Sequence, residues 1–147
     1  MFSNARDVTI EWGDCDPAGI VFYPRYFAMF DASTAALFVA ALGIGKREIL
    51  ERFEVIGFPM IETRAKFYRP SRFGDRVKIE TQIARVGRSS FDIAHRLLLA
   101  SGELGIEAWD SRVWTARDSN HPSGISAKPI PPEVLSRLTN HSETELK

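Results

Sequence analysis

The sequence predicts an α+β fold in which one antiparallel β-sheet wraps around a single long, buried α-helix. The prediction rests on a change in apolar periodicity along the 147 residues. Apolar side chains first recur at every third or fourth position, the spacing of one helical face, across residues 24–42. The period then changes to two, which is typical of half-buried strands, in residues 58–68, 76–86, 90–100 and 105–117. One helix followed by strands joined through short turns favours an antiparallel sheet packed on that helix.

The helix predicted over residues 24–42 is apolar on nearly every face. One face carries Phe27, Phe30, Thr34, Leu37, Phe38 and Ala41, and the other faces carry mostly alanine. A helix of this composition is typically buried, and its small residues let a sheet approach closely. Asp31 is the only charged residue between Phe27 and Leu42, so its carboxylate must be paired, hydrogen-bonded or functional. We give equal weight to a structural hydrogen bond and to a functional contact.

The other elements have their own local signals. Residues 7–12 alternate strictly between apolar and polar side chains, which predicts a half-buried strand. Pro24 suits the first turn of the long helix, and Gly43 suits its end. Residues 46–53 predict a short amphipathic helix, and residues 131–138 predict another that begins at a pair of prolines.

The chain contains no repeat and no long linker. We therefore expect a single domain over residues 1–147, with a core at about 7–117 and a C-terminal extension at 118–147. A single helix leaves one face of the sheet uncovered. We expect a second copy of the chain to contribute to the assembly, as a homodimer or as a dimer of dimers, which is a homotetramer.

The composition limits the classes of function. Apolar residues make up 44% of the chain and charged residues 26%, the usual balance of a soluble protein. The 19 basic and 19 acidic residues cancel, which argues against a nucleic-acid partner. The one cysteine allows no internal disulfide and fits a reducing cytoplasm. The sequence shows no signal-peptide pattern, and the apolar region at 35–44 is too short to span a membrane, so we expect a cytoplasmic protein with no membrane partner.

Two carboxylates, two glycines and the only cysteine lie in the stretch directly before the buried helix. Residues 13–24 read Gly-Asp-Cys-Asp-Pro-Ala-Gly-Ile-Val-Phe-Tyr-Pro. A helix N-terminus supplies free backbone N–H groups and a partial positive charge. Asp16 fits a turn residue, because Asp-Pro is common in turns. It also fits a carboxylate that attacks a carbonyl or activates water beside those N–H groups, and we favour this second interpretation. Asp14 is more simply a hydrogen-bonding residue of the loop.

Cysteine and metal chemistry are both disfavoured. Cys15 lies between two carboxylates, which oppose the thiolate that a nucleophile needs. His95, His121 and His141 fall on a predicted strand, a loop and the tail, and none has the spacing of a metal-binding pair. We expect no metal and no cofactor.

The stretch from Gly13 to Tyr26, followed by Asp31, closely resembles the 4-hydroxybenzoyl-CoA thioesterase family. The resemblance extends to about residue 117 and implies the hotdog fold and hydrolysis of an acyl-CoA thioester. It implies that Asp16 is the catalytic carboxylate and that the backbone N–H of Tyr23 polarises the thioester carbonyl. It also implies that Asp31 contacts a ring hydroxyl in the members that act on aromatic acyl groups. Coenzyme A would then be part of the substrate.

Further contacts are expected around the acyl group and the nucleotide. The acyl group, aromatic or short and aliphatic, is expected to contact Phe22, Pro59, Met60 and Ile61. Residues 64–96 hold nine basic side chains against three acidic ones, which suits either the phosphates of coenzyme A or a charged, solvated sheet edge. Arg88 and Ser90 are the stronger candidates for CoA binding, and Arg69 and Arg85 are the weaker ones.

Two other functions remain open on the same fold. Hydration or dehydration of an acyl thioester would ordinarily use a histidine near the active site, and residues 13–42 contain none. A non-catalytic protein that binds acyl thioesters would not need Asp16. The sequence also leaves open whether coenzyme A or an acyl carrier protein bears the acyl group.

Overall fold

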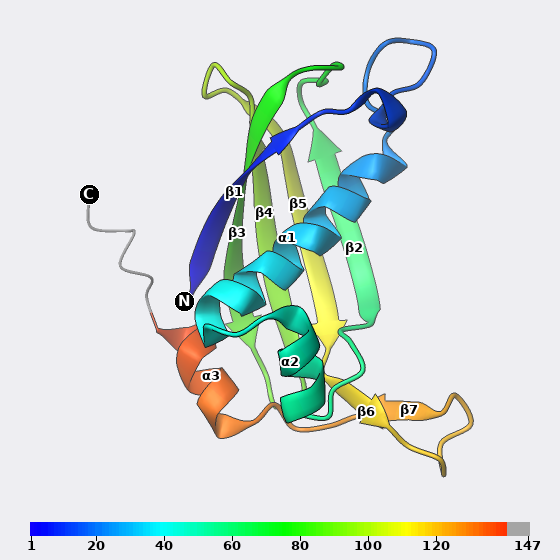
Figure 1. The fold of residues 1–147 in the computed structure, drawn as a ribbon, viewed down its shortest axis with the longest axis vertical. Helices are drawn as coiled ribbons and strands as arrows, with labels where there is room; N and C mark the ends of the chain where they lie inside the picture. The colour runs from blue at the N-terminus through cyan, green and yellow to red at the C-terminus, as the bar shows by residue number, and fades with distance from the viewer. Residues whose placement is uncertain (141–147) are drawn as a thin grey trace.

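The computed structural model describes residues 1–140, which form one five-stranded antiparallel sheet with helices on one side (Figure 1). The sheet has the order β1-β3-β4-β5-β2, and β2 lies at one edge. A small two-stranded sheet, β6-β7, extends beyond the end of β5. The predicted α+β class and the wrapping of the sheet around one long helix are confirmed. The elements are β1 (Ser3–Thr9), η1 (Trp12–Asp14), α1 (Pro24–Leu42), α2 (Lys46–Arg52), β2 (Met60–Phe67), β3 (Arg76–Val86), β4 (Ser90–Leu98), β5 (Leu104–Val113), β6 (Thr115–Arg117), β7 (Ile125–Ala127) and α3 (Pro132–Thr139).

The long helix α1 has the boundaries that the sequence predicts. Pro24 occupies its first turn, and Gly43 ends it in a left-handed conformation with φ of 71°. Its buried side includes Phe30, Leu37 and Phe38, which lie against the inner face of the sheet. By length and composition alone α1 could cross a membrane. Here it crosses the inner face of the sheet diagonally instead (Figure 1).

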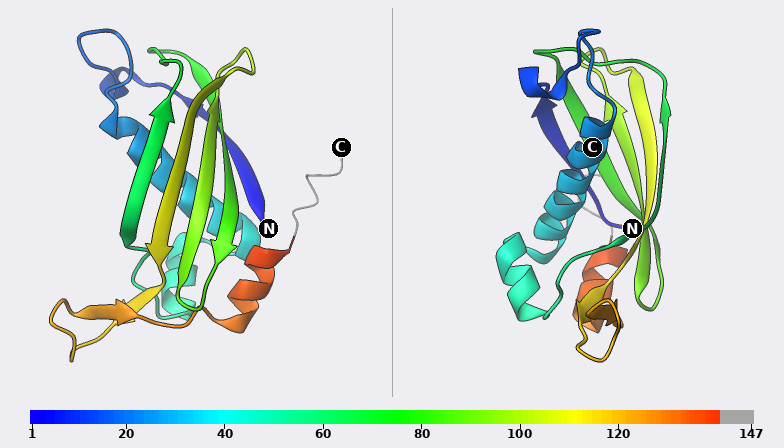
Figure 2. Two further views of the ribbon diagram at one scale, coloured as in Figure 1. Left: turned by 180° about the vertical axis from the view of Figure 1, so that it is seen from behind. Right: turned by 90° about the vertical axis from the view of Figure 1, so that its right-hand side faces the viewer.

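The two faces of the sheet differ in character, because the strands alternate. On β3 the inward side chains Val77, Ile79 and Ile83 are buried, while its outward side chains are mostly charged. The outer face is bare of helices (Figure 2). It carries polar pairs such as Arg96 with Glu80, 3.7 Å apart. This polar face can stay in water, so it gives no reason for a covering layer.

The edge strand β2 is the more suitable place for a second copy. It pairs with β5 on one side only, and its other edge has no strand partner among residues 1–140. Apolar side chains along it are exposed, with Ile61 at 63% and Phe67 at 50%. An unpaired edge with exposed apolar side chains is a site for strand pairing. The expected homodimer stays a prediction, now with β2 as its structural basis.

Two strand boundaries differ from the expected ones. The first strand covers Ser3–Thr9 rather than 7–12, because Glu11 and Asp14 form reciprocal capping hydrogen bonds that close a 3₁₀ turn. Trp12, the last apolar residue of the alternation expected over 7–12, lies outside the strand and is 74% exposed. The last long strand, expected to continue through residue 117, breaks after Val113, and β6 turns away to pair with β7.

The segment after the sheet returns to the main core. In α3, Val134 and Leu138 are fully buried and belong to the same apolar cluster as Leu37 and Phe38 of α1. The backbone N–H of Phe2 donates to the carbonyl of Leu138 at 2.8 Å, which joins the start of the chain to α3. The region expected as a C-terminal extension therefore contributes to the core through α3.

Candidate active site

The loop that carries Asp16 is a tight, internally hydrogen-bonded turn before α1. The N–H of Asp16 donates to the carbonyl of Ile20 at 3.0 Å, and the N–H of Gly19 donates back to the carbonyl of Asp16 at 2.9 Å. Gly19 has φ of 80°, which favours glycine at this position. The N–H of Ala18 donates to Oδ1 of Asp16 at 2.8 Å. Asp16 therefore acts as a turn residue, as its sequence allows, while its second carboxylate oxygen makes no further bond among residues 1–140.

The start of α1 leaves one backbone donor free beside this loop. Pro24 has no N–H, and the N–H groups of Arg25 and Tyr26 donate to the carbonyls of Phe22 and Tyr23. The N–H of Tyr23 donates to no acceptor within residues 1–140, and no side chain caps the helix. A free N–H at a helix N-terminus favours a negatively charged or polarised oxygen.

The loop and the helix start are fixed to the connection between β2 and β3. The N–H of Val21 donates to the carbonyl of Ser71 at 2.9 Å, and the N–H of Ser71 donates to the Tyr26 hydroxyl at 3.1 Å. Ser71 is fully buried. The N–H of Phe22 also donates to the carbonyl of Asp14 at 2.8 Å, so the backbone on either side of the Asp16 turn is paired and Asp16 is kept close to the start of α1. Sequence reasoning missed Ser71, because a serine between two predicted strands carries no distinctive signal.

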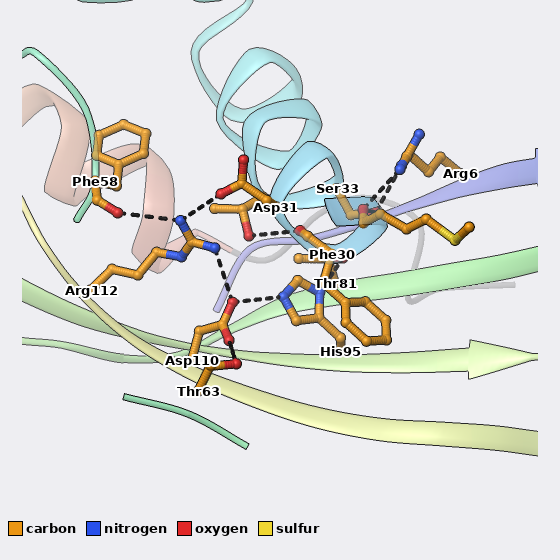
Figure 3. A network of polar contacts seen from close by, with 12 residues as sticks. Arg6, Phe30, Asp31, Ser33, Phe58, Thr63, Thr81, His95, Asp110 and Arg112 are labelled. Atoms are coloured by element: carbon orange, nitrogen blue, oxygen red, sulfur yellow. Dashed lines mark hydrogen bonds and ion pairs between the residues drawn. The ribbon is translucent and has the colours of Figure 1, made fainter. Parts of the chain in front are cut away.

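A second polar group lies further along α1, where Asp31 meets the inner face of β5 (Figure 3). Nη1 of Arg112 donates to Oδ1 of Asp31 at 2.8 Å and to the carbonyl of Phe58 at 3.2 Å. Nη2 of Arg112 donates to Oδ2 of Asp110 at 3.1 Å. Arg112 and Asp110 are buried, whereas the side chain of Asp31 is 61% exposed. Asp31, for which the sequence left a structural bond and a functional contact equally open, is thus ion-paired, and its contact with substrate stays a prediction.

Asp110 is the buried centre of this group. It accepts hydrogen bonds from the Thr63 hydroxyl at 2.7 Å and from Nε2 of His95 at 3.3 Å. Burial alone would raise the pKa of Asp110, but the hydrogen bonds from His95 and Thr63 and the charges of His95 and Arg112 outweigh it and hold the pKa below its ordinary value. Because a carboxylate only accepts, Nε2 of His95 donates to Asp110, and the other ring nitrogen, Nδ1, lies 2.9 Å from the Thr81 hydroxyl.

A pocket of about 300 Å³ lies beside Asp31, between α1, the residues before β2 and the end of β5. Its lining includes Asp31, Thr34, Lys46, Phe58, Pro59 and Arg112. Of the expected acyl-binding residues, Pro59 and Asp31 line it. Met60 and Ile61 follow directly on the exposed start of β2, while Phe22 lies at the other end of α1, next to Tyr23.

The expected CoA-binding residues fall into two separate groups. Arg85, Arg88 and Ser90 surround the turn between β3 and β4, where Arg85 donates to Asp92 at 2.7 Å and to the Ser90 hydroxyl at 3.1 Å. The hydrogen bond from Arg85 holds the pKa of Asp92 below its ordinary value. Arg88 is exposed, and no side-chain hydrogen bond is formed by it within the described part of the chain.

Arg69 belongs to the opposite end of the sheet. It forms an exposed ion pair with Glu103 at 3.4 Å, beside the turn between β4 and β5. The nine residues of β4 separate the two turns by about 30 Å. Asp16 lies at the Arg69 end, because its loop is bound to Ser71. One chain therefore places one group at this end and the other toward the opposite end. The first group is Asp16, Phe22, Tyr23 and Arg69, and the second is Asp31, Pro59, Met60, Arg85, Arg88 and Ser90.

Asp110 and Arg112 were missed at the level of sequence, although a signal existed. Asp110 and Arg112 lie on the same face of the predicted strand as Ile106 and Ala108, because the four follow one another at every second position. Two charged residues therefore lie on an apolar face. Charges on a buried face must be paired or functional. His95, which the sequence places on a predicted strand, is buried, with its ring stacked on Phe30 at 4.9 Å between centroids.

Comparisons with known proteins agree with this architecture. A family model described as the thioesterase-like superfamily matches residues 10–138. The chain is 36% identical, over 82% of its length and 92% of the relative's, to 4-hydroxybenzoyl-CoA thioesterase of Pseudomonas sp. strain CBS-3. The solved structure of 4-hydroxybenzoyl-CoA thioesterase from that strain superposes with a TM-score of 0.83 at 29% identity, covering 92% of this chain and 98% of the other.

A second solved structure, of a gentisyl-coenzyme A thioesterase, gives a TM-score of 0.77 at 31% identity. It covers 93% of this chain and 100% of the other. The family match spans most of the chain, and the curated relative is similar along nearly its whole length. The chain therefore belongs to the thioesterase-like superfamily, in the 4-hydroxybenzoyl-CoA thioesterase family of hotdog-fold proteins that its sequence resembles.

Proposed function

We propose that this protein hydrolyses acyl-CoA thioesters, with Asp16 as the catalytic carboxylate and the backbone N–H of Tyr23 as the donor to the thioester carbonyl. The free N–H of Tyr23 beside the half-bound carboxylate of Asp16 carries the proposal. A donor fixed at a helix N-terminus stabilises the oxyanion without reorganising. The family's named members, which include hydrolases of CoA thioesters, support the same reaction class.

Two routes use these groups and give the same products. In the first, a carboxylate oxygen of Asp16 attacks the carbonyl carbon, the thiolate of coenzyme A leaves, and water then hydrolyses the mixed anhydride to regenerate Asp16. In the second, Asp16 takes a proton from a water molecule that attacks the carbonyl carbon directly. In both, negative charge develops on the carbonyl oxygen, where the N–H of Tyr23 would donate to it.

The proposed active form is a homodimer, or a dimer of dimers, joined along β2. A second copy that pairs antiparallel to β2 would bring the Met60 end of one strand beside the Phe67 end of the other. Asp16 of one chain would then lie near the Asp31 and Arg88 end of the partner subunit. In a single chain the expected residues lie toward opposite ends of the sheet, and this separation supports the assembly.

The proposed acyl group is a hydroxylated aromatic one, with a short aliphatic group as the alternative. Three kinds of relatives bear names with hydroxylated aromatic acyl groups: 4-hydroxybenzoyl, gentisyl and 1,4-dihydroxy-2-naphthoyl. The pocket beside Asp31 combines apolar walls, such as Phe58 and Pro59, with a carboxylate, a composition suited to a ring that carries a polar group. We propose that Arg88 and Ser90, with Arg69 and Arg85, contact the nucleotide.

A panel of acyl-CoAs incubated with a thiol-detecting reagent tests the reaction. Release of free coenzyme A from 4-hydroxybenzoyl-CoA, benzoyl-CoA or short aliphatic acyl-CoAs is the expected result. A change in absorbance of an enoyl-CoA without thiol release would show hydration instead. Binding of acyl-CoA without either reaction would identify a non-catalytic protein and overturn the proposal.

A further inference from the structure

The ion pairs of Arg112 with Asp31 and Asp110 reach the pocket beside Asp31 (Figure 3). They have no role in the cleavage step proposed above. We infer that Arg112 is a positioning residue for substrate choice: it holds Asp31 so that one carboxylate oxygen serves the pocket as a hydrogen-bond acceptor. The site then prefers acyl groups that carry a hydroxyl or amino donor over those that carry only an acceptor or a negative charge. This inference rests on the proposed function, which brings the acyl group into this pocket.

Both terminal nitrogens of the Arg112 guanidinium are hydrogen-bonded to neighbours, while its buried Nε has no partner among residues 1–140. Nη1 bonds Asp31 at 2.8 Å and the carbonyl of Phe58 at 3.2 Å, and Nη2 bonds Asp110 at 3.1 Å. The planar guanidinium presents its donors in a fixed fork, so it sets the direction as well as the distance of each carboxylate. Its positive charge is balanced by both carboxylates. Arg112 therefore has little charge left to attract an anionic acyl group.

The side chain of Arg112 is held in place through Asp110, which lies deeper in the core. Asp110, which holds Nη2, is itself held by the hydroxyl of Thr63 at 2.7 Å and by the ring of His95 at 3.3 Å. The ring of His95 is packed against Phe30 with 4.9 Å between centroids. These partners come from β2, β4 and α1. A guanidinium braced by three elements cannot follow a ligand, so Asp31 is presented in one orientation.

Asp31 supplies the acceptor. Its side chain is 61% exposed, and its Oδ1 is bonded to Arg112 while the other oxygen has no partner among residues 1–140. A carboxylate accepts hydrogen bonds and donates none. A hydroxyl or amino group on the acyl moiety can complete this site, whereas a methoxy oxygen cannot. A carboxylate on the acyl group would meet repulsion from Asp31, with the exposed ammonium of Lys46 as the only opposing charge in the pocket lining besides Arg112.

The native protein gives the first test, because it needs no variant. The kcat/KM values of benzoyl-, 4-hydroxybenzoyl-, 4-methoxybenzoyl- and 4-carboxybenzoyl-CoA are compared at one pH and ionic strength. We expect the hydroxyl compound to exceed the methoxy compound by at least about tenfold, the effect of one hydrogen bond to a charged acceptor. Equal values, or a preference for the carboxyl compound, would overturn the inference.

Variants then assign the preference to Arg112. Arg112→Met should lower the ratio of 4-hydroxybenzoyl to benzoyl turnover to the ratio of Asp31→Asn, and the double variant should lower it no further, because both act on one contact. Arg112→Lys keeps the charge but not the fork, so it should also lower the ratio. If Arg112→Met fails to fold, the substrate ratio of Arg112→Lys is measured in its place.

Arg6 provides a matched control on the same helix. It donates to the Ser33 hydroxyl at 2.7 Å and to the carbonyl of Met29 at 2.8 Å, but from β1 and away from the pocket. Arg6→Met should lower the melting temperature and leave the substrate ratio unchanged. A native ratio in the Arg112 variants, or an equal fall in Arg6→Met, would contradict the inference. Absence of any thioester hydrolysis by the native protein would instead contradict the proposed function.

Discussion

Replacement of Asp16 by asparagine separates the structural role of this side chain from its proposed chemical role. Asparagine keeps an oxygen in the place of Oδ1, so the 2.8 Å hydrogen bond from the N–H of Ala18 survives. The free energy of unfolding should then change by less than about 1 kcal/mol, the usual contribution of a single hydrogen bond. The loss of the negative charge removes the nucleophile or general base. We expect kcat to fall by at least about 100-fold, which corresponds to about 2.7 kcal/mol in the barrier.

The assay pairs thiol release with thermal unfolding, and Asp14→Asn is its matched control. Asp14 lies in the same loop, and its Oδ2 accepts a hydrogen bond from the N–H of Glu11 at 2.9 Å. Its replacement removes the same charge two residues away and should leave kcat close to native. If Asp16→Asn keeps a near-native kcat, or if Asp14→Asn loses as much activity, Asp16 is only a turn residue and the catalytic assignment is wrong.

Three further predictions concern assembly, the nucleotide and acid stability. Light scattering at micromolar concentration should give the mass of a dimer or a tetramer, and a monomeric mass would contradict the proposed pairing along β2. Arg88→Ala should raise KM for acyl-CoA more than it lowers kcat, because phosphate contacts stabilise ground and transition states alike. An unchanged KM in this variant would remove Arg88 from the site. As a comparison, Arg85→Ala breaks the ion pair with Asp92 and should mainly lower stability. The pKa of Asp110 is lower in the folded state, so its ionised form contributes stability at pH values above the ordinary aspartate pKa of about 3.9. This contribution is lost as the pH falls through the folded-state pKa. The stability of Asp110→Asn should therefore depend less steeply on pH than that of the native protein in this acidic range.

The sequence alone predicted the fold well because its strongest signals are local. The apolar pattern of α1, its proline start and its glycine end follow from helix geometry and need no tertiary contact. The strict alternation in β3 likewise identified its buried face. Where the prediction of strand boundaries was wrong, at residues 7–12 and after Val113, side-chain capping and a change of strand partner decided the outcome. The periodicity of apolar residues along the chain contains no information on either of these effects.

The sequence also located the candidate catalytic loop, since Asp16 and Tyr23 lie within one short stretch and their relation is set by local backbone. It also indicated Asp31, because this residue is a lone charge on an apolar helix and helical periodicity is a local signal. Their catalytic and binding roles stay predictions. The sequence could not show that Arg112 holds Asp31, because the two residues lie 81 positions apart and meet only when β5 packs beneath α1.

Tertiary structure alone decided how the expected residues are distributed. Arg69 and Arg88 are both basic residues at strand ends, yet the antiparallel order of the sheet places them at opposite ends of the molecule. It also decided that β2 is an open edge of the sheet, which makes β2 the place where a second copy can pair. Strand order is set by long-range pairing and by the burial of one shared core. These contacts join residues far apart in the chain, and no local pattern of side chains encodes them.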